Sequence, residues 1–368
     1  MKISSGDQLA RRFYFLNACV TVVLLATIVV SVLHFGAAAW KEPWHVGLVL
    51  VGEKTDPGWN MAQYRGMQAA CNALGYELLL QEGVRSDAEN CRKAIRELAE
   101  RRANIIFLTN LISAKDMKDM VNEYPHVQFF GMEMDPSSLE PNRYAVRYVE
   151  PFYLAGILAG LRTKTGQTGY IAPYPDPEFF QAVNAFAIGV QRVNPSAQVL
   201  LAWSGGWENH AAEEQAVRDL KSSSVDVLAY FQDGETIPAA AEREKIDFVS
   251  MYGPYSNYSH RLATIRVDWK KTYSHLLRRN LRPDGHLAYT ASSLDRSVDI
   301  EASVPFLSAR ERAIFETEYW EIQQGKIVFS GAIFDRNGIQ RCGEGETISN
   351  QALPQMNWLA KGVKVIGD

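Results

Sequence analysis

After residue 44 the chain alternates short apolar runs with amphipathic segments, a pattern typical of repeated strand–helix units. The first series of predicted strands spans residues 45–51, 76–80, 104–109 and 127–132. The second series spans residues 168–173, 199–203, 226–231 and 247–251. Such alternation predicts parallel sheets covered by helices on both faces, so we predict an α/β fold with two doubly wound, Rossmann-like lobes.

The chain beyond its N-terminal segment, about 330 residues, is longer than one typical hydrophobic core. We therefore predict an N-terminal lobe of residues 41–150, completed by a later return of the chain near residues 268–305. The predicted C-terminal lobe consists of residues 151–267 and is completed by residues 306–368. Each lobe then combines segments that lie far apart in the sequence.

Residues 13–40 form an almost uninterrupted apolar run that contains no acidic residue and follows a basic flank. A basic flank before an apolar stretch is typical of an export or membrane-insertion signal. The run is long enough to span a bilayer, while the small residues 37–39 fit a signal-peptidase site. We expect residues 1–40 to be either a cleaved signal peptide or a retained membrane anchor. Both alternatives place residues 41–368 outside the cytoplasm.

The charge and the cysteine content argue against two classes of protein. The formal net charge is −4 and the isoelectric point is near 6.0, so the basic surface of a nucleic-acid-binding protein is missing. Four cysteines are too few for a disulfide framework in an exported chain, so a hydrophobic core must hold the fold. We expect Cys71 and Cys91 to be free, buried thiols and Cys342 to be unpaired.

The sequence carries none of the common catalytic or cofactor-binding motifs. It lacks a GxSxG elbow, a GxxxxGK[ST] phosphate loop, an HExxH zinc motif and a GxGxxG dinucleotide motif. Its seven histidines do not pair at the spacing of metal ligands. We therefore expect a protein that is not an enzyme and that uses neither a cofactor nor a metal.

The loop after the first predicted strand holds the strongest candidates for ligand binding, because ligands of parallel sheets bind outside the carboxyl ends of the strands. Trp59 lies on a Gly-Pro loop, where it is costly to expose unless it stacks on a ligand or packs in the core. Asn60 either contacts the ligand or caps the helix that starts there. Asp56 either contacts the ligand or bonds its own loop backbone.

Further candidates follow other predicted strands. Thr109 and Asn110 follow a buried strand, and Tyr174 lies at a Pro-rich strand exit. Trp207 follows a Gly-Gly pair and either binds the ligand or packs at a hinge. Glu133 sits in an apolar strand region, so it must be paired or bind a polar group.

Several segments, in their order and spacing, resemble the basic-membrane-protein family of ABC importer substrate-binding proteins, which is similar to the purine nucleoside receptor. The matching segments are residues 56–60, 153–160, 163–170, 184–189 and 329–338. The resemblance covers nearly all of residues 44–365. It implies a type I periplasmic-binding-protein fold, in which two lobes joined by a hinge close over a ligand.

The resemblance also implies roles for individual residues. An aromatic residue of the first loop stacks on the base in purine-binding members, and Trp59 has that position. An acidic residue after the fourth-strand region contacts the base nitrogens, so Glu133 is the candidate and Asp135 the reserve. Asp233 falls where a polar contact from the second lobe is expected. Tyr252 stands where the nucleoside receptor has a ribose-binding acid. A free nucleobase or another flat heterocycle is therefore as compatible with the sequence as a nucleoside. The full candidate set is Asp56, Trp59, Asn60, Thr109, Asn110, Glu133, Tyr174, Trp207, Asp233 and Tyr252.

These observations predict an extracytoplasmic substrate-binding protein of an ABC importer, which binds a purine nucleobase or nucleoside between its lobes by aromatic stacking. The expected partners are that small-molecule solute and an ABC permease in the membrane, and the protein is expected to be monomeric. One alternative is a membrane-anchored ligand sensor with the same two lobes. A nucleoside hydrolase acting through Asp56 and Glu133 is a weaker alternative, because no catalytic constellation accompanies them.

Overall fold

The computed structural model describes residues 15–30, 43–109, 119–120, 122–132, 142–253, 257–279, 288–303 and 305–367. Residues 15–30 form a helix with exposed apolar side chains, in a unit separate from His45–Asp368. None of the helices in the described ranges combines the length and the apolar character needed to cross a bilayer. The choice between signal peptide and anchor stays a prediction.

The first sheet has six strands in the order β11-β5-β4-β3-β1-β2, and all of its paired neighbours run parallel. The strands are β1 (His45–Val49), β2 (Glu77–Gln81), β3 (Ile105–Leu108), β4 (Gln128–Met132), β5 (Arg143–Val146) and β11 (Ala288–Ala291). The helices that accompany it are α2 (Trp59–Leu74), α3 (Ala88–Glu100) and α9 (Trp269–Arg279). β3, β4 and β5 are almost wholly buried, as continuous apolar runs in parallel sheets require.

The second sheet has seven strands in the order β12-β10-β9-β8-β6-β7-β15. Its strands are β6 (Gln167–Ala172), β7 (Gln198–Trp203), β8 (Val227–Tyr230), β9 (Asp247–Met251), β10 (Arg261–Val267), β12 (Val298–Ala302) and β15 (Val363–Val365). Its helices are α5 (Val149–Arg162), α6 (Pro177–Val193), α7 (His210–Ser222), α8 (Thr236–Glu244) and α10 (Ala309–Gln323). A short hairpin, β13 (Ile333–Phe334) with β14 (Gln340–Cys342), and a 3-10 turn, η1 (Leu353–Gln355), follow. Two largely parallel sheets confirm the predicted α/β fold.

The late return of the chain to the first sheet is shorter than residues 268–305. β11 pairs with β5, and α9 packs on α2, so both belong with the first sheet. β12 instead pairs antiparallel with β10 of the second sheet. Val298 and Ile300 of β12 are buried, so this strand extends the second core and not the first.

The cysteines agree with the prediction. Cys71 of α2 and Cys91 of α3 are free and buried, and they belong to separate hydrophobic clusters. Cys342 is also free and buried. Packing therefore holds the described part of the fold without a bond between these thiols.

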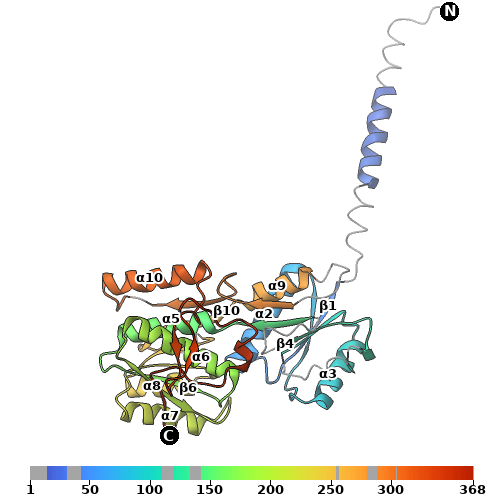
Figure 1. The fold of residues 1–368 in the computed structure, drawn as a ribbon. Helices are drawn as coiled ribbons and strands as arrows, with labels where there is room; N and C mark the ends of the chain where they lie inside the picture. The colour runs from blue at the N-terminus through green and yellow to red at the C-terminus, as the bar shows by residue number, and fades with distance from the viewer. Residues whose placement is uncertain are drawn as a thin grey trace, which may run out of the picture. The chain divides into compact units, whose positions relative to one another are not determined.

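Helices α5 and α6 lie side by side through glycines (Figure 1). A Cβ atom added at Gly156 would lie 2.0 Å from the carbonyl oxygen of Phe186. A Cβ added at Gly189 would lie 2.1 Å from the carbonyl oxygen of Tyr153. Backbone oxygens cannot move away as a flexible side chain can, so both positions require glycine for the helices to approach this closely.

Gly156→Ala is expected to lower the free energy of unfolding by about 2 kcal/mol or more, because the added methyl group overpacks the contact between α5 and α6. Urea unfolding followed by circular dichroism measures this change. Gly206→Ala is the matched control, since a Cβ there meets nothing within 4 Å. Equal stability of both variants would show that the two helices separate at no cost.

Candidate functional site

A cavity of about 290 Å³ lies among loops that leave both sheets. We name it the cleft cavity. It is lined by Val51, Trp59, Asn60, Ser86, Thr109, Met132, Tyr148, Glu178, Trp207, Glu208, Phe231, Asp233 and Tyr252. Val51, Thr109, Phe231 and Tyr252 come at or just beyond the carboxyl ends of their strands, where open α/β sheets bind ligands. Six predicted residues meet here: Trp59, Asn60, Thr109, Trp207, Asp233 and Tyr252.

The indole of Trp59 lines the cavity and also packs in an aromatic cluster. It is the first residue of α2, after Gly58, whose φ of 98° suits glycine. Its ring lies edge-on to Trp269 at 5.4 Å and to Tyr252 at 6.1 Å, measured between ring centroids. These contacts hold the half-buried ring in place. The two alternatives for Trp59, packing and facing a ligand, are thus compatible with each other.

Asp233 connects the two sheets across the cavity. Its Oδ1 accepts a hydrogen bond of 3.1 Å from the backbone N–H of Trp59, so the loop after β8 is tied to the start of α2. Burial raises the pKa of this carboxyl to about 7, against the opposing effect of the Trp59 N–H. The nearby carboxylate of Glu208 raises it further. Asp233 therefore exchanges a proton near neutral pH.

Glu178 is a second acid of the cavity, and the sequence analysis missed it. It lies in the first turn of α6, and its Oε2 is buried with no hydrogen-bond partner among the described residues. Burial raises the pKa of Glu178 to about 8, and the neighbouring Asp176 carboxylate adds to the shift. A buried carboxylate oxygen without a partner costs free energy unless something supplies a hydrogen bond. An acid in the first turn of a helix ordinarily interacts favourably with the helix dipole, so its position in the sequence did not indicate a ligand-binding role.

Two tyrosines complete the wall. The hydroxyl groups of Tyr148 and Tyr252 lie 2.8 Å apart and share a hydrogen bond. Burial raises the pKa of both phenols well above its usual value, so both stay protonated. Tyr252 has a φ of 66°, a conformation that costs free energy for any residue except glycine. Such local strain is common at binding sites.

Some predicted residues lie elsewhere. The Oδ2 of Asp56 accepts a 2.6 Å bond from the Glu53 N–H, which matches the alternative that Asp56 bonds its own loop. Tyr174 is exposed and rests edge-on against Phe179, outside the cleft cavity. Gly58 holds the N-cap of α2, so Asn60 does not cap that helix. Its Oδ1 accepts from the Gly52 N–H at 3.1 Å. Asn110, Glu133 and the reserve Asp135 lie outside the described residues.

The charge of the cavity wall is one-sided. Glu178, Glu208 and Asp233 are acidic, and no lysine, arginine or histidine is among the described lining residues. Over the same described ranges, no group of three His, Cys, Asp or Glu side chains is placed to hold a metal ion. The wall therefore suits a neutral or positively charged organic ligand and disfavours a phosphate.

The free energy of unfolding of the ligand-free protein is expected to fall by at least about 2 kcal/mol between pH 5 and pH 8. The folded pKa values of Asp233 and Glu178, about 7 and about 8, exceed the ordinary values of unfolded carboxyl groups. In this pH range the folded state keeps protons that the unfolded state has released, so rising pH favours unfolding.

Urea unfolding at a series of pH values measures this dependence. The double variant Asp233→Asn/Glu178→Gln should flatten the profile, because neither new amide titrates. A wild-type profile that is already flat, or one that the double variant leaves unchanged, would contradict the raised pKa values.

Comparison with known proteins identifies a family for this chain. The Bmp family model, described as ABC transporter substrate-binding protein PnrA-like, matches residues 44–293. A purine-binding protein of Brucella abortus is 24% identical over 335 residues, which cover 89% of this chain and 95% of that protein. A provisionally named ABC transporter glucose-binding protein of Haloferax volcanii is 27% identical over 243 residues, covering 65% of this chain and 61% of that protein.

Solved structures agree on the fold. A solute-binding protein of an ABC transporter system from Conexibacter woesei superposes with a TM-score of 0.63 at 16% identity, covering 77% of this chain and 97% of that one. A second one, from Aeropyrum pernix, gives 0.64 at 13% identity and covers 77% and 92%. These likenesses confirm the type I periplasmic-binding-protein fold. Because the family model spans more than half of the chain, the protein belongs to the Bmp family of PnrA-like ABC transporter substrate-binding proteins.

Proposed function

We propose that the protein binds a purine nucleobase or nucleoside in the cleft cavity and delivers it to an ABC permease. The observation that carries this proposal is the joint placement of a fixed indole, Trp59, and two half-buried acids, Glu178 and Asp233, around one cavity. A flat heterocycle offers a face to the indole and polar atoms to the acids. At about 290 Å³ the cavity is near the lower end of small-molecule sites, which suits one ring system.

The acids suit a purine edge in a specific way. Purines present N–H donors beside nitrogen lone pairs, so a matching site needs both acceptors and donors. A carboxyl group accepts through both oxygens when ionised and donates through its O–H when protonated. Because the pKa values of Asp233 and Glu178 are about 7 and about 8, both forms are present near neutral pH.

The relatives support the ligand class to different degrees. The Brucella relative, named as purine-binding, matches over nearly its whole length. The Haloferax relative, named as glucose-binding, makes a sugar the second candidate ligand. Aromatic faces and carboxylates also recognise sugars, so the two candidates compete for the same cavity.

The family implies a location and a partner. Its members are extracytoplasmic substrate-binding proteins of ABC transporters, and we place residues 41–368 on that side of the membrane. Residues 1–40 would export the chain as a signal peptide or hold it as an anchor. The alternative function, a ligand sensor with the same two lobes, requires that the anchor is retained. Mass spectrometry of the mature protein determines where its N-terminus lies. A mature chain that starts near residue 40 has lost the anchor, which would exclude the sensor.

A thermal-shift screen of the full chain in detergent tests the proposal. Ligands that bind the folded state raise the melting temperature by mass action. We expect shifts with adenine, guanine or their nucleosides, and none with amino acids. A shift with glucose alone would replace the purine with a sugar, and a response to no compound of these classes would refute the ligand assignment.

A further inference from the structure

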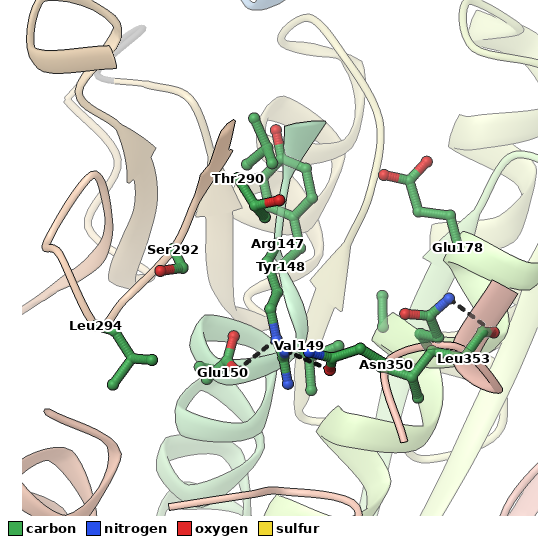
Figure 2. Close-up of a pocket in the computed structure, with 13 residues that line it drawn as sticks. Arg147, Tyr148, Val149, Glu150, Glu178, Thr290, Ser292, Leu294, Asn350 and Leu353 are labelled. Carbon is green, nitrogen blue, oxygen red and sulfur yellow. Dashed lines mark hydrogen bonds and ion pairs between the residues drawn. The ribbon is translucent and has the colours of Figure 1, made fainter. Parts of the chain in front are cut away.

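Two further cavities differ in their relation to the cleft cavity. One, of about 170 Å³, shares Tyr148 and Glu178 with the cleft cavity and so belongs to the site already described (Figure 2). The other, of about 320 Å³, has no described lining residue in common with either of them. We name this separate space the edge cavity.

The edge cavity lies at the carboxyl edge of the second sheet, beside the outer strands. Trp203 is the last residue of β7 and Val365 is the last residue of β15, and these two strands pair in parallel. Phe180, in the first turn of α6, and Trp358, in the C-terminal segment, also line the cavity. The cleft cavity instead uses the loops that follow β8 and β9, in the middle of the same sheet. The two cavities therefore occupy different parts of the edge where α/β sheets bind ligands.

Three aromatic side chains, all half-buried, contribute to the wall of the edge cavity: Phe180, Trp203 and Trp358. The rings of Phe180 and Trp203 meet edge-on, with their centroids 5.9 Å apart. The guanidinium of Arg341 lies over the ring of Trp358, 5.8 Å from its centroid. Such a wall offers a large apolar contact area and favours a ligand with a flat ring.

The acid in the described wall of the edge cavity, Asp335, is already satisfied by the protein. It is 1% exposed, and its Oδ1 accepts hydrogen bonds from the backbone N–H groups of Asn337 at 2.9 Å and Ile339 at 3.0 Å. Its Oδ2 accepts from Nε of Arg341 at 2.8 Å and lies 2.7 Å from Nη2 of the same guanidinium. These bonds use the lone pairs of the carboxylate, and Arg341 compensates its charge.

The remaining polar groups of the wall include several hydrogen-bond donors. Arg336 adds a second positive charge, and Asn337 and Asn357 add side-chain amides. The backbone N–H of Arg336 donates to the carbonyl of Leu359 at 2.8 Å, which fixes the place of this residue. Because Arg341 compensates Asp335, the described wall carries a net positive charge, the opposite of the acidic cleft cavity. A wall of this kind attracts an organic anion.

We propose that the edge cavity is a second ligand site, separate from the cleft cavity, for a small aromatic carboxylate. The ring of the ligand packs among the aromatic side chains, and its carboxylate accepts hydrogen bonds from Arg336 and the neighbouring amides. A volume of about 320 Å³ suits one ring with a short acidic substituent. The acids of the cleft cavity would repel the same ligand, so the two sites select different compounds. This inference does not depend on the proposed function.

Isothermal titration calorimetry of the full chain in detergent tests the site with benzoate, its neutral analogue benzamide and inorganic phosphate. We expect benzoate to bind at least about tenfold more tightly than benzamide, because hydrogen bonds between a guanidinium and a carboxylate are stronger than those to a neutral amide. Phosphate should bind at least about tenfold more weakly than benzoate, because it gains nothing from the aromatic wall.

Four variants locate the binding of benzoate. Arg336→Gln should weaken it by about fivefold or more, because glutamine keeps a donor and loses the charge. Trp203→Leu should weaken it by a similar factor, because it removes a ring face. Arg310→Gln, at an exposed position of α10, is the control for Arg336→Gln and should not change the affinity. Trp59→Ala alters the cleft cavity and should also leave benzoate binding in place. The melting temperature of each variant shows whether it is folded.

Equal affinities for benzoate and benzamide, or an Arg336→Gln variant that binds benzoate like the wild type, would overturn the proposal. Loss of benzoate binding in Trp59→Ala but not in Arg336→Gln would place benzoate in the cleft cavity and also overturn it. Phosphate that binds as tightly as benzoate would show a simple anion site and refute the aromatic carboxylate. Because purine binding is measured separately, none of these results decides the proposed function.

Discussion

Trp59→Ala is expected to weaken purine binding by roughly 10- to 100-fold, because stacking of a base on an aromatic side chain contributes about 1–3 kcal/mol. T-shaped contacts with Trp269 and Tyr252 hold the indole in place, so the ring is preorganised and loses little entropy on binding. Titration calorimetry with the best purine ligand measures the change.

Two further variants separate stacking from packing. Trp59→Phe retains an aromatic face and should lose only a small part of the affinity. Trp320→Ala, on α10 with a side chain 61% exposed, should leave the affinity unchanged. If Trp59→Ala binds the purine as tightly as the wild type, Trp59 is a core residue and the stacking role is wrong.

Asp233→Ala is expected to weaken purine binding by about 100-fold or more, the larger of the two effects at this site. The carboxylate lines the cavity and also accepts the Trp59 N–H, so its loss removes a ligand contact and the bond that joins the loop after β8 to α2. The N–H left behind in a half-buried position adds to the cost. Affinity is measured as for Trp59.

Asp233→Asn is the matched variant, because it keeps the shape and an oxygen that can accept from Trp59 but cannot ionise. We expect its affinity for the purine to lie between those of the wild type and Asp233→Ala. Between pH 6 and pH 8 its affinity should depend less on pH than that of the wild type. Wild-type affinity in Asp233→Ala would show that the ligand does not approach this acid.

The strands could be predicted closely from the sequence because their signal is local. The run at 104–109 contains β3, Ile105–Leu108, and the run at 168–173 is offset by one residue from β6, Gln167–Ala172. Strands buried on both faces are continuous apolar runs, which a short window detects. The partner of β12 was not predictable in this way. Its alternation marks a half-buried strand, but pairing with β10 depends on the whole chain path.

The lining residues of the cavity were predictable in two ways. Trp59 was found because an aromatic side chain on a turn needs an explanation. Asp233 was found through the family resemblance, which implies a polar contact from the second lobe at that position. Glu178 was missed because an acid in the first turn of a helix already has an explanation, its favourable interaction with the helix dipole. Tyr148 was missed because its hydroxyl faces Tyr252 only after the two sheets come together. For Asp56 the sequence left two alternatives open, because its loop position does not fix where its side chain points, and the structure shows the bond to its own loop.

A crystal structure of the full chain with adenosine tests the central claim most directly. We predict the base against the indole of Trp59 in the cleft cavity, with carboxylate oxygens of Asp233 or Glu178 within hydrogen-bond distance of its polar edge. A base bound away from Trp59, or a cleft cavity that holds only solvent at saturating adenosine, would contradict the account.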